Sequence, residues 1–176
     1  GTVSGSLQRQ RIEGSLEGTE LHLGRWAVNN VTAKHTFVLG DSVPEIHLEG
    51  NARGISTPAA GAYSTATLKL DLASPAFQLD LKADRVEGGV IEVAATGHIP
   101  AEGARRIELQ RARLDLGTGQ WALAGPSTIE WGRPGGGVDV RNLDFRAANA
   151  NGRLRVDGRV MPLAQFDARH LAALGG

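Results

Sequence analysis

The sequence lacks cysteine altogether, which excludes disulfides and thiolate metal sites from its chemistry. It also lacks a prevailing charge, because 19 Lys and Arg residues are balanced by 19 Asp and Glu residues. This balance gives no electrostatic reason to expect nucleic acid as a partner. Aromatic residues make up only 5% of the chain, and no apolar run reaches the roughly 18 residues of a membrane-spanning helix.

Glycine and alternating apolar residues are abundant instead. The 24 glycines are about twice the usual share of roughly 7%. Apolar and polar residues alternate over 66–72 and 77–84, and again over 138–147 and 153–160 on either side of an Asn-Gly turn. This period of two is typical of half-buried strands. The sequence therefore predicts an all-β chain of about a dozen strands, each with one apolar face.

The alternation slips by one residue at several places, including residues 29–30, the stretch between Leu109 and Ala112, and Arg141-Asn142. A slip would turn the following side chains to the wrong face unless a bulge absorbs the extra residue. Because bulges increase the twist of a sheet, recurrent slips indicate bent or coiled strands.

Two stretches break the pattern. Residues 51–65 are rich in Gly, Ala, Ser and Thr, which predicts a mobile loop. Residues 161–174 begin with a proline near the start, carry apolar residues on one side and are followed by glycine, which predicts a short amphipathic helix. The alternation is otherwise uniform, so we expect a single unit over residues 1–176. Because the sequence begins with Gly1 rather than Met, we expect it to be an excerpt of a longer chain.

Motifs for catalysis are missing. The five histidines are scattered, without the close helical spacing of zinc proteases. Acidic pairs such as Asp80 and Asp84 lie on a solvated strand face, without the apolar enclosure that raises the pKa of a general acid. The glycine-rich stretches 117–119 and 135–137 lead into strands and supply no Lys-Ser/Thr pair, so they are turns rather than phosphate cradles. We therefore expect no enzyme activity, no metal site and no cofactor.

Periodicity leaves two arrangements open. The apolar faces could bury one another in a closed β-sandwich. Alternatively, an elongated, coiled sheet could fold over lengthwise and leave an apolar groove between its walls. Burial of an acyl chain in such a groove is worth roughly 0.8 kcal/mol per methylene, so binding needs no polar specificity group. The residues assigned to the groove share an apolar position in an alternating strand: Leu68, Leu70, Leu72, Phe77, Leu79, Leu81, Leu114, Leu116, Trp121, Leu123, Val138, Val140, Leu143, Phe145, Leu154 and Val156.

The stretch from Trp121 to Val160 also carries a resemblance. Trp121, Leu123 and Pro126 open it, a glycine loop and paired strands follow, and GRLRVDGRV closes it before MPLAQFDARHL. This segment resembles the C-terminal region of the TamB family, the inner-membrane component of a translocation and assembly module related to AsmA-like proteins. Earlier in the chain, FQLDLKADRVEGGVIEVAATGHI is similar in style to the repeated strand pairs of that family.

The resemblance implies a β-taco, an elongated all-β sheet with a concave apolar interior. It implies a periplasmic protein that is anchored to the inner membrane and works with a barrel partner of the outer-membrane assembly class. The family is implicated in moving phospholipid between membranes and in assembling outer-membrane proteins. The function expected from the resemblance is therefore to carry or shelter hydrophobic cargo, foremost phospholipid acyl chains. Two alternatives stay open: a chaperone that binds unfolded β-strands of outer-membrane clients, and a carbohydrate-active β enzyme.

Overall fold

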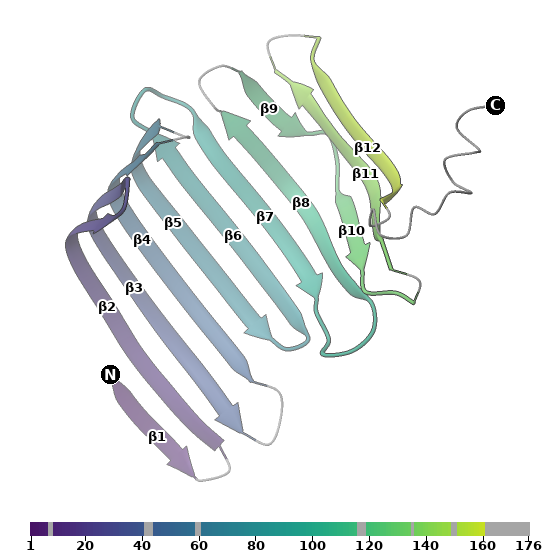
Figure 1. Cartoon of the computed structure of the whole chain (residues 1–176). Helices are drawn as coiled ribbons and strands as arrows, with labels where there is room; N and C mark the ends of the chain where they lie inside the picture. Colours follow the sequence, from purple (N-terminus) through teal and green to yellow (C-terminus); the bar gives the residue numbers. More distant parts are fainter. Residues whose placement is uncertain are drawn as a thin grey trace.

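The computed structural model of the chain describes residues 1–6, 9–40, 44–58, 61–115, 119–134, 136–148 and 151–160. Within these ranges the chain forms a single antiparallel sheet of twelve strands (Figure 1). The strands are β1 (Thr2–Ser6), β2 (Arg9–Leu23), β3 (Trp26–Gly40), β4 (Glu45–Thr57), β5 (Gly61–Ala73), β6 (Ala76–Arg85), β7 (Val90–His98), β8 (Arg105–Asp115), β9 (Gln120–Leu123), β10 (Ser127–Trp131), β11 (Val138–Ala147) and β12 (Arg153–Val160). The prediction of an all-β chain with about a dozen strands is confirmed.

The strand order follows the sequence almost throughout. From β1 to β8 each strand pairs with the next one along the chain, as expected where short connections join antiparallel strands. Beyond β8, both β9 and β10 lie between β8 and β11. β10 pairs with the first part of β8 and β9 with its last part, so the two short strands share one position end to end. The break between them contains Pro126, which has no backbone donor to offer a ladder.

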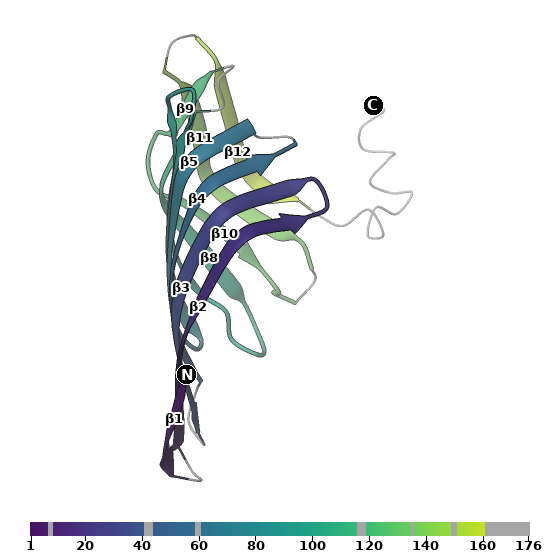
Figure 2. The same cartoon turned by 90° about the vertical axis from the view of Figure 1, so that its left-hand side faces the viewer.

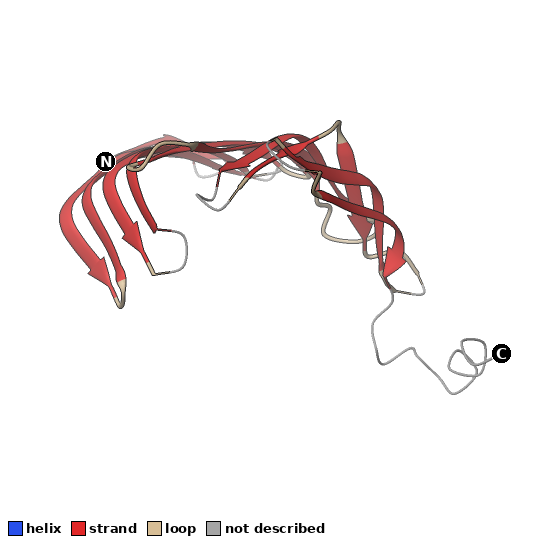
Figure 3. Ribbon diagram, turned by 90° about the horizontal axis from the view of Figure 1, so that it is seen from above, coloured by secondary structure: helices blue, strands red, loops and turns tan. Residues whose placement is uncertain are grey.

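The sheet is arched rather than flat. Seen from above in Figure 3, the two lateral ends of the sheet, around β2–β3 and β11–β12, bend to the same side. No second sheet and no helix covers either face in the part of the chain that the structure describes. The closed β-sandwich that the sequence left open is therefore not formed by these residues, and the elongated sheet is the arrangement found.

The register separates the side chains of the sheet into two faces, because residues directly opposite in an antiparallel ladder share a face. One face is apolar, as in the row Ile12, Phe37, Ile46, Leu72, Phe77, Gly97, Ile107, Ile129 and Val140. The other face is polar and charged, as in the row Ser15, Lys34, Glu49, Lys69 and Asp80. This division confirms the predicted alternation.

Two of the predicted slips are bulges in the ladder. The β11–β12 register shifts between Val140 and Leu143, and the β7–β8 register shifts at Gln110. Each bulge adds one residue to a strand, so the three-residue step from Val140 to Leu143 keeps both side chains on the apolar face. The predictions at these two places are confirmed.

The slip predicted at residues 29–30 takes a different form. In β3 three residues separate the successive apolar positions Val28 and Val31, instead of the usual two. β2, β4 and β5 make the same three-residue step opposite them, so the register between these strands does not shift. Glu20 and Gly54, which lie within the three-residue steps of β2 and β4, have positive φ angles of 53° and 62°. β6 makes an ordinary two-residue step, so the shift appears where β5 meets β6, between Tyr63 and Thr65. The matched steps let the ends of four neighbouring strands bend together (Figure 2).

Other expectations differ from the structure or lie outside it. Residues 51–65 were expected to form a mobile loop, but 51–57 and 61–65 belong to β4 and β5. The stretch is low in large apolar residues where β4 and β5 both make the three-residue step. The amphipathic helix expected over 161–174 lies outside the described residues. Among the described residues there is no helix long and apolar enough to cross a membrane.

Candidate functional site

The candidate site is the apolar face of the sheet. Leu116 lies outside the described residues, and the other residues predicted for the groove all lie on this face by their register. Cross-strand pairs among them include Leu70–Leu79, Leu114–Trp121 and Phe145–Leu154. Side chains that are up to 88 residues apart in the sequence, from Leu68 to Val156, thus become parts of one surface.

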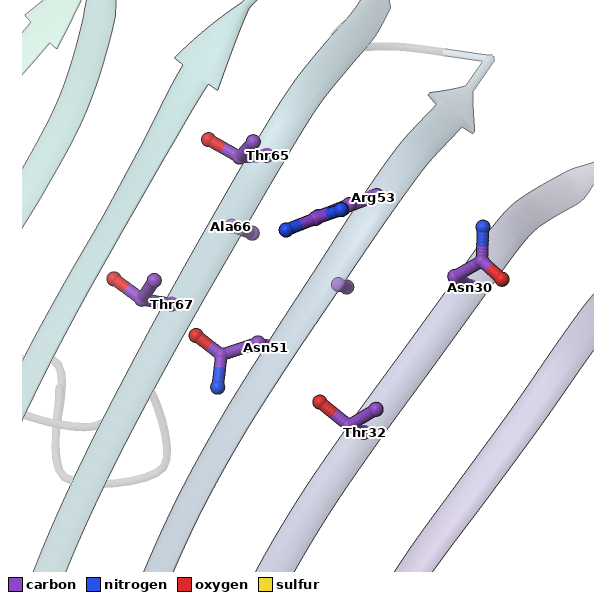
Figure 4. Close-up of a pocket in the computed structure, with 8 residues that line it drawn as sticks. Asn30, Thr32, Asn51, Arg53, Thr65, Ala66 and Thr67 are labelled. Carbon is purple, nitrogen blue, oxygen red and sulfur yellow. The ribbon is translucent and has the colours of Figure 1, made fainter.

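The apolar face is the concave side of the arch. Figure 4 views β2–β6 from the side opposite to Figure 1, since the strand order is reversed, and there Thr32, Asn51 and Thr67 project towards the viewer. The polar face is therefore turned away from the viewer in Figure 1 and the apolar face is turned towards the viewer. Figures 2 and 3 show that the ends of the sheet bend to that apolar side.

Because the sheet is a single layer, its apolar side chains are only partly buried. The buried hydrophobic residues are few and mostly small, namely Tyr63, Ala94, Ala95, Ala112 and Val140. Large side chains on the apolar face stay open to solvent, with Leu16 57% and Leu154 54% exposed. A continuous uncovered apolar surface is typical of a binding site or an interface.

The apolar face extends beyond the residues that the sequence singled out. Phe37, Ile46 and Leu48 continue it over β3 and β4, and Val93 and Ile107 continue it over β7 and β8. The sequence shows the alternation of these strands but not their position beside the predicted groove residues. Only the register places them in the same rows.

A groove enclosed between two apolar walls is not supported, because the apolar face is open along the described residues. One hollow of about 660 Å³ lies instead on the polar side (Figure 4). Its polar lining consists of amides, hydroxyls and one guanidinium: Asn30, Thr32, Asn51, Arg53, Thr65 and Thr67. No pattern in the sequence pointed to this hollow, since its residues come from three strands whose register the sequence does not show.

The polar face consists largely of paired charges. Lys69 lies 3.0 Å from Glu49 across the β4–β5 ladder and lowers the pKa of that carboxyl group. Arg153 binds Asp144 at 2.7 Å and lowers its pKa to about 2. Glu130, whose side chain is 9% exposed, lies among Arg133, Arg106 and Arg141.

This arrangement favours the ionised form of three carboxylates. Glu49, Asp84 and Asp144 all have a pKa below the ordinary value, because hydrogen bonds from Lys69, Thr65 and Arg153 respectively favour the ionised form. A general acid needs the opposite shift. Among the described residues no three metal-ligating side chains come together.

Comparisons with known proteins do not identify a function, so the chemistry of the apolar face is the guide to function. Protein-family models, curated proteins and solved structures give no match to this chain.

Proposed function

We propose that the concave apolar face carries or shelters the acyl chains of lipids. The observation that supports this proposal is a continuous apolar surface on the inner side of an arch, which no other described element covers. The resemblance of the stretch from Trp121 to Val160 to the TamB family points the same way. On that resemblance we also propose a periplasmic location, an inner-membrane anchor in the full-length protein and an outer-membrane barrel protein as partner.

The energetics of an open apolar face suit transport better than permanent storage. Complete burial of one methylene contributes roughly 0.8 kcal/mol. A chain of about sixteen carbons with half of its surface covered therefore gains roughly 6 kcal/mol, before the loss of its freedom of motion is subtracted. Such binding is weak enough to release the chain and needs no polar group for recognition. A lipid could then move along the surface without crossing a high barrier.

Replacing apolar residues within the face tests the proposal. The L70D/L79D variant changes a directly opposed pair on the apolar face of β5 and β6. The control Q78D changes a residue on the polar face of β6. Each variant is incubated with phospholipid vesicles, isolated and examined by native mass spectrometry, and circular dichroism checks that its strands persist. We expect L70D/L79D to retain at least about tenfold less lipid than the wild type and Q78D to retain as much. Equal retention by a folded L70D/L79D variant contradicts the proposal.

A second candidate function is the binding of unfolded β-strands from client proteins. It is favoured by the free edges of β1 and β12, each of which pairs on one side only within the described sheet. A free edge offers unpaired backbone groups to which an extended peptide can add as a further strand. A photo-crosslinker at Arg155 of β12 that captures an unfolded outer-membrane protein, in a preparation that retains no lipid, favours this second function over the first.

A further inference from the structure

Two arginines lie at the margins of the apolar face. Arg85 ends the alternating series of β6 after Leu81 and Ala83, so it lies on the same side as they do. Arg105 begins the alternating series of β8, two residues before Ile107. Most other Lys and Arg residues of the strands lie on the polar face, where many of them pair with carboxylates. A charged group in an apolar surface is costly unless it has a partner, so these two positions call for an explanation.

Both guanidinium groups have an unused donor. Arg85 Nε and Arg105 Nε are buried and lack a hydrogen-bond partner. Among the described residues, no other buried side-chain nitrogen or oxygen atom is without a partner. Arg85 donates to the carbonyl oxygen of Asp115 at 3.2 Å, and Arg105 donates to that of Ala101 at 3.4 Å. Neither arginine has an ion pair within those ranges. The planar fork of arginine suits the oxygens of a phosphate or carboxylate group.

Each arginine has an aromatic neighbour across the ladder. Tyr63 lies directly opposite Arg85, and Trp131 lies directly opposite Arg105. Tyr and Trp are the residues that gather at the boundary between acyl chains and headgroups in membranes, because their rings are apolar and carry a polar handle. The pairing of a cation with such a ring thus occurs twice on the apolar face.

The two pairs lie at opposite ends of the strands. β6 and β8 run in the same direction, since both are antiparallel to β7, and Arg85 ends the first while Arg105 begins the second. His98 of β7 pairs with the first residue of β6 on one side and with the neighbour of Arg105 in β8 on the other. Arg105 therefore lies level with the start of β6, which is 10 residues long. At about 3.3 Å per residue the two levels are separated by roughly 30 Å along the strands. The hydrocarbon core of a bilayer, in which two acyl chains meet end to end, is also about 30 Å thick.

We propose that Arg85 and Arg105 each bind the anionic headgroup of a lipid whose acyl chain lies on the apolar face between them. Two lipids then lie tail to tail, with their headgroups at opposite rims of the sheet. This inference rests on the proposed function and adds to it the class of lipid and the number bound. It makes the two guanidinium groups the determinants of headgroup selectivity, while the apolar rows supply most of the affinity.

The test compares two lipids with identical acyl chains. The complete chain is incubated with vesicles that contain equal parts of dipalmitoyl phosphatidylglycerol, which is anionic, and dipalmitoyl phosphatidylcholine, which is zwitterionic. Retained lipids are counted by native mass spectrometry. The variants are R85Q, R105Q, R85Q/R105Q and the charge-conserving R85K/R105K. The matched control is R53Q, which removes an arginine without an ion pair among the described residues from the opposite face of the sheet.

We expect the wild type and R53Q to retain up to two molecules of phosphatidylglycerol, with about a tenfold preference over phosphatidylcholine. Each single variant should retain one, and R85Q/R105Q should lose the preference while it still binds phosphatidylcholine. R85K/R105K should keep a preference for phosphatidylglycerol. A preference that persists in R85Q/R105Q, or that R53Q also abolishes, overturns the inference.

The failure of this inference can be told from the failure of the proposed function. If the wild type retains both lipids equally, the apolar face binds lipid but the arginines do not select it, and this inference alone falls. If the wild type retains neither lipid, the proposed function falls as well. Loss of both lipids in both double variants shows that the arginines support the sheet rather than the ligand, which also overturns the inference.

Discussion

At the scale of single residues, the polar face depends on carboxylates that neighbouring cations keep ionised. Asp144 accepts hydrogen bonds from Arg153 Nε at 2.7 Å and Nη2 at 2.8 Å, and a further bond from Arg146 at 3.1 Å. These bonds lower the pKa of Asp144 from 3.8 to about 2. Because the pKa is lower in the folded state, the stabilisation is complete above the unfolded-state value and is lost as the pH falls from 3.8 towards 2.

The D144N variant tests this contribution. We expect it to unfold at a lower urea concentration than the wild type at pH 7, because Arg153 and Arg146 lose their charged acceptor. The difference in unfolding midpoint should shrink as the pH falls from 4 to 2, where the wild-type carboxyl group becomes protonated. The control is D157N, because the carboxylate of Asp157 lies 3.5 Å from Arg155 in a looser ion pair. This variant should have a smaller effect. A difference that stays constant down to pH 2 contradicts the assignment.

Two glycines of the apolar face predict opposite responses to an added methyl group. A Cβ at Gly97 would overlap Phe77 Cε1 and would lie 2.8 Å from the carbonyl oxygen of Arg106, so the neighbours would have to move. A Cβ at Gly50 would meet only Leu68 Cβ at 3.9 Å and Thr32 O at 4.0 Å, which are ordinary contacts. We expect G97A to lower the free energy of unfolding by about 1–3 kcal/mol.

The matched substitution G50A should be neutral or stabilise by up to about 1 kcal/mol, because alanine restricts the unfolded chain without straining the sheet. Urea denaturation followed by circular dichroism measures both variants. If the two have the same stability, the packing of Phe77 over Gly97 is not a constraint on the sheet.

At the scale of elements, bulges decide which face a side chain joins. In β11 the bulge at Asn142, with a positive φ of 56°, separates Val140 from Leu143. Without the extra residue, Leu143 and Phe145 would turn to the polar side, since the side-chain period of a strand is two. The same requirement explains why the matched steps of β2–β5 keep the apolar face continuous through their bend.

Deletion of Asn142 tests the role of this bulge. We expect the deletion to lower the free energy of unfolding by at least about 3 kcal/mol, because Leu143 and Phe145 lose their apolar contacts. The control N142G keeps the length of β11 and suits the positive φ, so it should change the stability by no more than about 0.5 kcal/mol. Chemical denaturation compares the two. A deletion variant as stable as the wild type would show that β11 can move its register without loss.

At the scale of the whole molecule, the arch presents more apolar surface than a two-layered fold would. A sandwich buries the inner faces of two sheets against each other, whereas here Trp26, Leu39 and Val160 remain 56%, 44% and 58% exposed. The folded protein is therefore expected to enhance the fluorescence of an anionic naphthalene dye that binds apolar surfaces.

Lysophospholipid should displace this dye in proportion to its concentration, and L70D/L79D should bind less dye than Q78D. Fluorescence titration of the folded chain measures both effects, with the urea-unfolded chain as the background. Dye binding that does not exceed this background contradicts an uncovered apolar face.

The sequence predicted the strands well, and the role of the apolar face as a binding site stays a prediction. The alternation around Leu70 and Leu79 was sufficient to assign both residues to one face, because period two is a local property of a strand. The glycine- and alanine-rich stretch 51–65 was predicted as a loop, because its side chains give little periodic signal where the strands bend. Arg85 and Arg105 went unnoticed, since a charge at a strand end is ordinary in a sequence and becomes unusual only on an apolar surface.

The sequence by itself determined that the chain is all-β, that each strand has an apolar and a polar side, and that bulges interrupt β8 and β11. These features depend on the pattern of neighbouring residues along one strand. Only the tertiary structure decided that the strands form one open arch rather than a sandwich, that the apolar side is the concave one, and that two cations lie at its opposite ends. Those features depend on register and curvature, which arise from backbone pairing between strands and leave no mark in the alternation of any single strand.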